Sequence, residues 1–284
     1  VRDQCPDLGD VYVIGLGAID TIIEYGRAVS DAEFLEREQA VKGSDLATIV
    51  YTSGSTGTPK GVELTHANFV FITYSGVNSM PDIAMKPNRR LLLFLPLAHV
   101  FARYMQFFCF AGNVSLGLSS NLKTILADFK AFKPTFILAV PRIFEKIYNA
   151  ASQKAGAGFK GRVFADATQT ACDWSHAQQS GGSIPLALNA KHALYNKLVY
   201  SSIMEVFGGH VEYAVSGGAP LDSSIAHFFN GVGLPLLEGY GMTETCAPSS
   251  VNPTEGYKIG TIGLPLQGVT MGVDEEGELC IKSP

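Results

Sequence analysis

Short apolar runs rich in β-forming residues alternate with helical patterns from Leu46 onward. Residues 46–51 predict a buried strand, and residues 91–95 and 135–140 predict two more. Between the last two, apolar residues recur at helical spacing over residues 122–132, before the stop signal Lys133-Pro134. This order is typical of α/β proteins, so we expect a layered fold of largely parallel sheets flanked by helices.

The same alternation continues toward the C-terminal end. Residues 142–151 predict a helix, residues 211–215 a strand, and Asp222 the N-cap of a helix that runs to Phe229. Residues 234–237 then predict a strand that leads into a second glycine-rich turn. The weaker pattern over residues 156–182 indicates a surface helix between loops, and the Gly, Pro and β-prone runs from Thr254 onward indicate a β-rich segment.

Composition excludes several classes of protein. The 284 residues are 46% hydrophobic and 17% charged, which argues against disorder. The formal net charge of −5 provides no basic surface for nucleic acid. Five cysteines without a CxxC pair favour a reducing cytoplasm over a disulfide framework. His99, Arg103 and Asn113 interrupt the most apolar stretch, residues 91–118, so it reads as buried core rather than a membrane span.

The strongest chemical signal is the segment of residues 52–61, which directly follows the first predicted strand. Its glycines permit tight turns with converging N–H groups, its hydroxyls add donors and Lys60 adds positive charge. We therefore expect a polyphosphate cradle rather than a flexible linker. A Walker A loop does not fit, because Pro59 stands where that motif has Gly and Gly61 where it has Ser or Thr. The pattern Gly15-Leu16-Gly17 is interpreted as chance, since Asp20 replaces the third glycine of a dinucleotide motif and no clear helix follows.

Three segments together resemble a known family. Residues 51–66, YTSGSTGTPKGVELTH, closely resemble the phosphate-loop signature of the adenylate-forming superfamily, which includes acyl-CoA synthetases, luciferases and peptide-synthetase adenylation domains. Residues 238–245, EGYGMTET, resemble its adenine and magnesium motif, and residues 216–220, SGGAP, resemble its adenosine-contacting turn. Their order along the chain is also that of the family.

The resemblance implies roles for individual residues in binding ATP and Mg²⁺, with CoA as co-substrate. In this family a carboxylate attacks the α-phosphate of ATP to give an acyl-adenylate and pyrophosphate. By resemblance Thr243 would touch the α-phosphate, Glu244 would ligate Mg²⁺ and Tyr240 would lie against adenine. Taken alone, Glu244 reads as a solvated loop carboxylate and Tyr240 as core packing; the motif favours the functional roles. The residues implied to cradle the phosphates or contact the nucleotide are Thr52, Ser53, Gly54, Ser55, Thr56, Gly57, Lys60, Gly217, Gly218, Ala219, Pro220, Glu238, Gly239, Tyr240, Gly241 and Thr243.

Other segments bear on the acid that is activated. Residues 95–103, 140–148 and 198–201 resemble the long-chain fatty acyl-CoA synthetase branch. In that branch the histidine that matches His99 lies near the acyl carboxylate; the alternative is a hydrogen-bonded core histidine. The apolar residues after it either line an acyl channel or fill the core, and periodicity does not separate these cases. They are Phe101, Met105, Phe107 and Phe108.

The resemblance also predicts how the chain is organised. We expect residues 1–76 to end a first α/β lobe that carries the phosphate loop, residues 77–250 to form a second lobe, and residues 251–284 to begin a β-rich segment. By the resemblance we expect the family's first α/β segment to precede Val1 and its mobile C-terminal domain to follow Pro284, so that this chain is cut short at both ends. The expected function is activation of a long-chain fatty acid to acyl-CoA in the cytoplasm, with contact to a membrane surface left open. The alternatives are adenylation of another carboxylic acid and a non-catalytic nucleotide-binding fragment.

Overall fold

The computed structural model describes residues 5, 7–52 and 57–284. The chain divides into two compact units, residues 1–45 and residues 46–284. The first unit contains a short 3-10 helix, η2 (Ile14–Leu16), and the helices α1 (Ala18–Gly26) and α2 (Asp31–Ala40). A helix does therefore follow the Gly15-Leu16-Gly17 pattern, contrary to expectation. Because no strand precedes it among the described residues, the strand–turn–helix context of a dinucleotide motif is still lacking.

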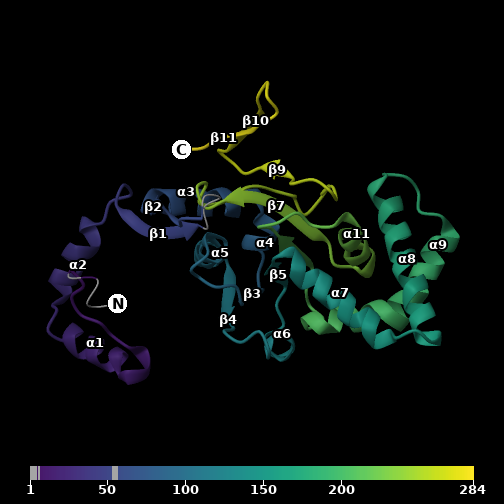
Figure 1. The fold of residues 1–284 in the computed structure, drawn as a ribbon, viewed down its shortest axis with the longest axis horizontal. Helices are drawn as coiled ribbons and strands as arrows, with labels where there is room; N and C mark the ends of the chain where they lie inside the picture. The colour runs from purple at the N-terminus through teal and green to yellow at the C-terminus, as the bar shows by residue number, and fades with distance from the viewer. Residues whose placement is uncertain (1–4, 6, 53–56) are drawn as a thin grey trace. The chain divides into compact units, whose positions relative to one another are not determined.

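The second unit begins with a two-stranded antiparallel sheet and contains a larger mixed sheet (Figure 1). The strand order in the larger sheet is β4-β3-β5-β6-β7-β8-β9, and a further antiparallel pair, β10 and β11, follows it. The strands are β1 (Leu46–Thr52), β2 (Lys60–Thr65), β3 (Arg89–Leu93), β4 (Val114–Leu118), β5 (Phe136–Ala139), β6 (Tyr213–Ser216), β7 (Leu236–Met242), β8 (Ala247–Val251), β9 (Leu264–Pro265), β10 (Thr270–Val273) and β11 (Leu279–Lys282).

The expectation of a largely parallel α/β sheet is confirmed for β3, β4, β5, β6 and β7, whereas β8 and β9 join the sheet antiparallel.

The helices of this unit are α3 (His66–Ser79), α4 (Pro81–Ala84), α5 (Val100–Ala111), α6 (Ile125–Phe132), α7 (Pro141–Ala155), α8 (Phe159–Gln179), α9 (Leu186–Tyr195), α10 (Ser201–Met204) and α11 (Ser223–Val232), with a π-helical turn η3 (Asn196–Tyr200) and a 3-10 turn η4 (Glu205–Phe207).

Helices cover both faces of the large sheet, and β5 shows how its residues are divided between two cores. Phe136 and Leu138 belong to one core cluster with residues of α3 and α5. Ile137 and Ala139 belong to a second cluster with residues of α6 to α8 and α11. All four side chains are buried, as expected for a parallel strand with both faces covered.

The prediction of a buried strand over residues 46–51 is right about the strand and wrong about its burial. β1 pairs only with β2, so it has one packed face, on which Val50 is buried beside Leu64. Tyr51 points the other way and is 71% exposed. The apolar run is therefore typical of a half-covered hairpin rather than of a central strand.

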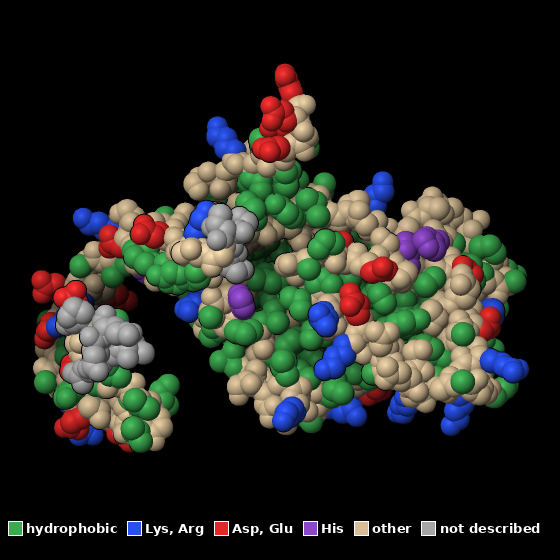
Figure 2. Space-filling view, viewed as in Figure 1, with side chains coloured by type: hydrophobic (Ala, Val, Ile, Leu, Met, Phe, Trp, Pro, Cys, Tyr) green, Lys and Arg blue, Asp and Glu red, His purple; other side chains and the backbone are tan. Residues whose placement is uncertain are grey.

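Several other sequence predictions are confirmed. Asp222 caps α11 by accepting hydrogen bonds from the backbone N–H groups of Ser224 and Ile225. The weak pattern over residues 156–182 forms α8, whose buried face includes Phe164 and Ala171. The region from Thr254 onward contains β9, β10 and β11, and Figure 2 shows acidic side chains at the tip of the β10–β11 pair. In the described residues no helix combines the length and apolarity that crossing a membrane requires.

Candidate functional site

The predicted phosphate loop joins the two strands of an antiparallel hairpin. Thr52 ends β1 and is paired with Lys60, the first residue of β2. Gly57, within the connection, has φ +83, a left-handed conformation that favours glycine. Lys60 is exposed. The residues Ser53, Gly54, Ser55 and Thr56 lie outside the described residues.

The second predicted motif follows the carboxyl end of β6. Gly217 is buried, and a Cβ atom there would lie 3.4 Å from the Gly239 carbonyl oxygen and 3.4 Å from the Phe101 ring. Gly218 has φ +81. A larger side chain at Gly217 would crowd β7 and α5, so this glycine permits the close approach of three elements. Ala219 and Pro220 are exposed.

The third motif is a strand, not the glycine-rich turn that we expected. Residues 238–242 lie within β7 and pair with β8. A Cβ atom at Gly241 would lie 1.9 Å from the Ala247 carbonyl oxygen, and one at Gly239 would lie 2.9 Å from the Ser250 carbonyl oxygen. The glycines thus allow β8 to approach β7 closely. A close approach of another backbone is a common reason for glycine in a strand.

A tight turn connects β7 to β8 and carries Thr243 and Glu244. The Thr245 hydroxyl accepts from the Met242 N–H at 3.0 Å and closes this turn. Cys246 and Ala247 follow with φ +56 and +91, conformations that cost non-glycine residues free energy and often occur at functional sites. Glu244 is exposed and Thr243 is half-buried.

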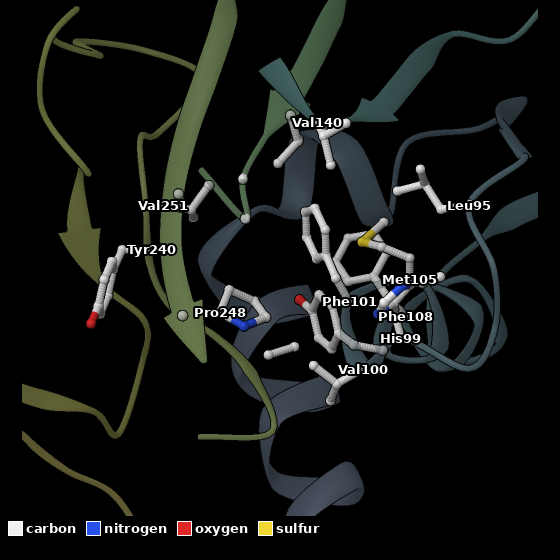
Figure 3. A pocket seen from close by; sticks show the side chains of 18 of the residues that line it. Leu95, His99, Val100, Phe101, Met105, Phe108, Val140, Tyr240, Pro248 and Val251 are labelled. Atoms are coloured by element: carbon white, nitrogen blue, oxygen red, sulfur yellow. The ribbon is translucent and has the colours of Figure 1, made fainter. Parts of the chain in front are cut away.

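The carboxyl ends of β5, β6 and β7 border a cavity of about 410 Å³ (Figure 3). Most of its lining is apolar. This volume lies in the range of small-molecule sites. The lining residues are Met80, Ile83, Leu95, Pro96, His99, Val100, Phe101, Ala102, Tyr104, Met105, Phe108, Phe136, Val140, Val215, Gly217, Gly218, Gly239, Tyr240, Gly241, Met242, Thr243, Ala247, Pro248 and Val251.

The cavity brings together one part of the predicted site. The residues that line it include His99, Gly217, Gly218, Gly239, Tyr240, Gly241 and Thr243. Thr52, Gly57, Lys60, Ala219, Pro220, Glu238 and Glu244 are not part of its lining. The Tyr240 ring lies apart from the cluster of Phe101, Met105 and Phe108 in Figure 3.

His99 immediately precedes α5 and its side chain is exposed at the cavity. The alternative of a core histidine is therefore wrong. Among the residues described, none forms a hydrogen bond with its imidazole ring.

Three of the four apolar residues considered for an acyl channel line the cavity. Phe101, Met105 and Phe108 recur at i, i+4 and i+7 on one face of α5. Phe107 is not among the lining residues, and its ring instead packs 5.0 Å from that of Phe69 on α3, centroid to centroid. For Phe107 the alternative of core packing therefore applies, because it lies on a different face of the helix.

Sequence reasoning missed the residues at the buried end of the cavity. Tyr104 is 1% exposed, Ile83 is 1% and Met80 is 5%. Tyr104 lies at helical spacing from Phe101 and Phe108, and this spacing could have predicted that it shares their face of the helix. Nothing in the sequence distinguishes Met80 or Ile83, which α3 and α4 bring to the cavity, from ordinary core residues.

Two buried cysteines lie near this part of the core and are not suited to nucleophilic chemistry. Burial raises the pKa of the Cys109 thiol and that of the Cys246 thiol, each to about 12. Both are therefore protonated at neutral pH, and the thiolate is the reactive form.

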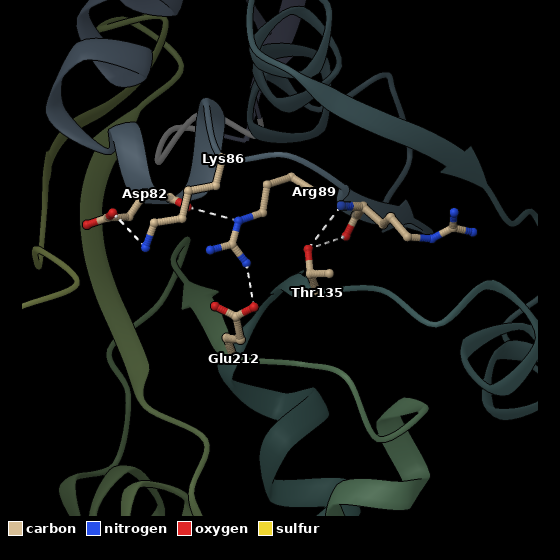
Figure 4. Close-up of polar contacts among 6 residues, drawn as sticks. Asp82, Lys86, Arg89, Thr135 and Glu212 are labelled. Carbon is tan, nitrogen blue, oxygen red and sulfur yellow. Dashed lines mark hydrogen bonds and ion pairs between the residues drawn. The ribbon is translucent and has the colours of Figure 1, made fainter.

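A polar cluster lies at the other end of the parallel strands (Figure 4). Arg89 begins β3 and is 4% exposed; it donates to Glu212 at 2.7 Å and to the Asp82 carbonyl oxygen at 2.9 Å. Lys86 pairs with the Asp82 carboxylate at 2.8 Å. The buried guanidinium is thus paired and hydrogen-bonded, as a buried charge requires. Its contacts link the start of β3 to α4 and to the residue before β6. We interpret it as structural.

The described residues contain no group of three or more His, Cys, Asp or Glu side chains arranged to hold a metal ion. Glu244 is the carboxylate nearest in sequence to the cavity residue Thr243. A single exposed carboxylate fits Mg²⁺, which proteins commonly bind through one or two carboxylates together with substrate phosphates.

Relatives with known names match most of this chain. A long-chain-fatty-acid–CoA ligase, FadD15 of Mycobacterium bovis, is 43% identical over 268 residues, which are 94% of this chain and 44% of that protein. Long chain acyl-CoA synthetase 3 of Arabidopsis thaliana is 34% identical over 258 residues, 84% of this chain and 38% of that protein. The chain thus spans less than half the length of these curated relatives.

Solved structures agree on the fold. The inhibitor-bound N-terminal domain of FACL13 from Mycobacterium tuberculosis superposes with a TM-score of 0.58 at 20% identity, over 94% of this chain and 62% of that one. An o-succinylbenzoate CoA synthetase, MenE from Bacillus subtilis in complex with ATP and magnesium, gives 0.56 at 20% identity, over 84% of this chain and 40% of that one. The family model described as AMP-binding enzyme matches residues 4–284. The chain belongs to the AMP-binding enzyme family, within the adenylate-forming superfamily that its three motifs resemble.

Proposed function

We propose that this chain forms the ATP-binding part of an enzyme that activates a long-chain fatty acid, first to an acyl-adenylate and then to acyl-CoA. The observation that carries the proposal is the position of the cavity. Its outer part is bordered by nucleotide-motif residues, among them Gly239 and Thr243, and its inner part by apolar side chains such as Met105 and Phe108. The carboxylate of a fatty acid placed at the boundary between these two parts would face ATP, and the alkyl chain of the acid would lie in the apolar part.

In the first step, a carboxylate oxygen of the acid attacks the α-phosphorus of ATP. A P–O bond to the acid forms, the bond to the β-phosphate oxygen breaks, and pyrophosphate leaves. We assign Thr243 to the α-phosphate, because it lines the cavity and lies on the tight β7–β8 turn. The N–H groups and hydroxyls around Gly57, with Lys60, would hold the two phosphates that leave and stabilise the charge that develops on them.

In the same proposal Glu244 would hold Mg²⁺, which when bound neutralises charge on the triphosphate. Tyr240 would offer its aromatic face to adenine. His99, exposed at the cavity and without a partner among the described residues, would hydrogen-bond the acyl carboxylate and keep it at the boundary.

In the second step, the thiol of CoA attacks the carbonyl carbon of the acyl-adenylate, and AMP leaves with one oxygen that belonged to the acid. Fatty acid, ATP and CoA are thus the proposed substrates. We place the reaction in the cytoplasm, because five cysteines without a CxxC pair suit a reducing compartment.

The substrate class is tested by kcat/KM for acetate, octanoate, palmitate and benzoate in the natural protein that carries this sequence. Each methylene buried in the apolar cavity should contribute at most about 0.8 kcal/mol, so kcat/KM should rise steeply from acetate through octanoate toward palmitate until the cavity is full. A preference for acetate or benzoate would overturn the long-chain assignment and leave adenylation intact. Absence of turnover with every carboxylic acid would favour a non-catalytic nucleotide-binding protein.

A further inference from the structure

The lining of the cavity includes residues at both ends of β5. Phe136, the first residue of this strand, and Val140, directly after its last, both line the cavity. Four residue steps in a strand span about 13 Å, and an extended chain advances about 1.2 Å per bond. The distance therefore corresponds to about ten methylene groups. The tail of a longer acid, with its carboxylate at the level of Val140, would reach the far end beside Phe136.

Tyr104 contributes to the buried wall of the cavity. Its side chain extends from α5, lines the cavity and is 1% exposed. Its hydroxyl is buried and has no hydrogen-bond partner among the residues that the structure describes. An unpaired buried hydroxyl is unfavourable, so Tyr104 is not explained by a polar contact and is better explained by the space that its ring fills.

Gly76 is the residue on α3 that accommodates the tip of Tyr104. A Cβ atom at Gly76 would lie 1.9 Å from the Tyr104 hydroxyl oxygen and 3.1 Å from the ring carbon that bears it. The first distance is impossible without movement, whereas the second requires only a small adjustment. The Tyr104 side chain thus spans from α5 to α3, and the missing side chain at Gly76 lets its ring form part of the cavity wall without filling the cavity.

We propose that the Gly76–Tyr104 pair limits the length of the acyl chain that the cavity accepts. This inference rests on the proposed function and specifies its substrate. A methyl group at position 76 displaces the tyrosine toward the cavity and shortens it. Removal of the tyrosine hydroxyl relieves that displacement, and a smaller side chain at position 104 lengthens the cavity.

The test measures kcat/KM for octanoate, dodecanoate and palmitate in four variants of the natural protein. Gly76→Ala should lower the palmitate-to-octanoate ratio about tenfold, the loss expected when one to two methylene groups are no longer buried. Tyr104→Phe should leave that ratio within about twofold of the wild type. The double variant Gly76→Ala/Tyr104→Phe should restore it to within about twofold, because the closest clash is absent.

The fourth variant, Tyr104→Leu, should raise the palmitate-to-dodecanoate ratio at least about fivefold, because dodecanoate has the ten methylene groups that the cavity already holds. It keeps the proposal testable if Gly76→Ala does not fold. Asn78→Ala, an exposed position on the same helix, serves as the matched control and should change neither ratio. An unchanged ratio in folded Gly76→Ala, or a double variant that is no better than Gly76→Ala, would overturn the proposal, as would an unchanged ratio in Tyr104→Leu.

A binding readout separates this inference from the proposed function. The rise in Tm on addition of octanoate or palmitate, without ATP, reports occupancy of the cavity independently of turnover. If no acid supports AMP formation, the proposed function fails. The inference about the Gly76–Tyr104 pair still holds if Gly76→Ala reduces the rise in Tm caused by palmitate and leaves the rise caused by octanoate unchanged. It fails if both rises in Tm persist or if both decrease together.

Discussion

The carbonyl oxygen of Glu238 accepts two hydrogen bonds from Asn252, one from its backbone N–H at 2.9 Å and one from its side-chain amide at 3.2 Å. The same amide donates to the Thr261 carbonyl oxygen at 2.6 Å, and its oxygen accepts from the Lys258 N–H at 2.9 Å. Asn252 is 3% exposed. It thus joins the first residue of the EGYGMTET segment to the loop that follows β8.

Asn252→Ala should therefore lower the free energy of unfolding by about 2–4 kcal/mol, because several buried polar groups lose a partner at once. Urea denaturation of the two proteins measures the difference. Asn113→Ala, at an exposed asparagine, is the control and should stay within about 0.5 kcal/mol of the wild type. Equal stabilities of the Asn252 and Asn113 variants would contradict the role of this network.

Glu244→Gln tests the proposed magnesium ligand. Glu244 is exposed on the β7–β8 turn, so its replacement should leave Tm nearly unchanged. Turnover should fall by about 10²–10³-fold, the effect typical of removing one group that stabilises the transition state. Glu255→Gln, at another exposed carboxylate in a loop, should retain full activity. Wild-type turnover in the Glu244 variant would refute the assignment.

Lys133→Gly should stabilise the protein. Lys133 is the exposed residue after α6 and has φ +53, a left-handed conformation that glycine adopts at little cost. We expect a gain of about 0.5–1 kcal/mol in the free energy of unfolding. Lys130→Gly, inside α6, should instead cost about 1 kcal/mol. A loss of stability in both variants would show that the backbone at Lys133 is not strained.

The sequence predicted the elements that have one clear periodicity and failed where two explanations produce the same pattern. The helix pattern over residues 122–132 stops at Lys133-Pro134, and α6 ends there. By contrast α5 is apolar on several faces, so the sequence indicated buried core without revealing a helix. The face of α5 that lines the cavity and the face that carries Phe107 are both apolar in sequence. Only the positions of α3 and β5 in the fold distinguish them.

Glycine was ambiguous for a different reason. In residues 238–242 it permits close approach of β8, whereas at Gly218 it permits a left-handed turn, and the sequence alone suggested turns for both. The convergence of His99, Gly217 and Tyr240 on one cavity depends on the parallel order of β3, β5, β6 and β7, because His99 follows β3, Gly217 follows β6 and Tyr240 lies in β7. The motifs predicted the residues, and the sheet topology determines which of them meet.

The pH dependence of stability should reveal the buried histidine of α11. Burial lowers the pKa of His227, and the nearby His176 lowers it further. The centroids of the His176 and His227 rings lie 3.6 Å apart, and the Ser175 hydroxyl oxygen lies 2.9 Å from the Nδ1 atom of His227. Because an unfolded histidine has a pKa of about 6.5, the unfolded chain binds this proton more readily. Stability is then present above about pH 6.5 and falls as the pH drops below that value.

His227→Gln removes this titration. The free energy of unfolding should decrease more between pH 7.5 and pH 5.5 in the wild type than in the variant, as measured by urea denaturation at both pH values. Identical decreases in the two proteins would show that His227 does not contribute to the acid sensitivity.

The central claim, attack of the acid on the α-phosphorus of ATP, is tested most directly by isotope transfer. Palmitate labelled with ¹⁸O in its carboxylate is incubated with ATP, Mg²⁺, CoA and the natural protein, and the nucleotide products are analysed by mass spectrometry. If the acyl-adenylate forms, AMP carries one ¹⁸O atom for each palmitoyl-CoA produced, and pyrophosphate carries none. If palmitate-dependent ADP appears with the label in inorganic phosphate, the acid attacks the γ-phosphorus instead and the account is wrong.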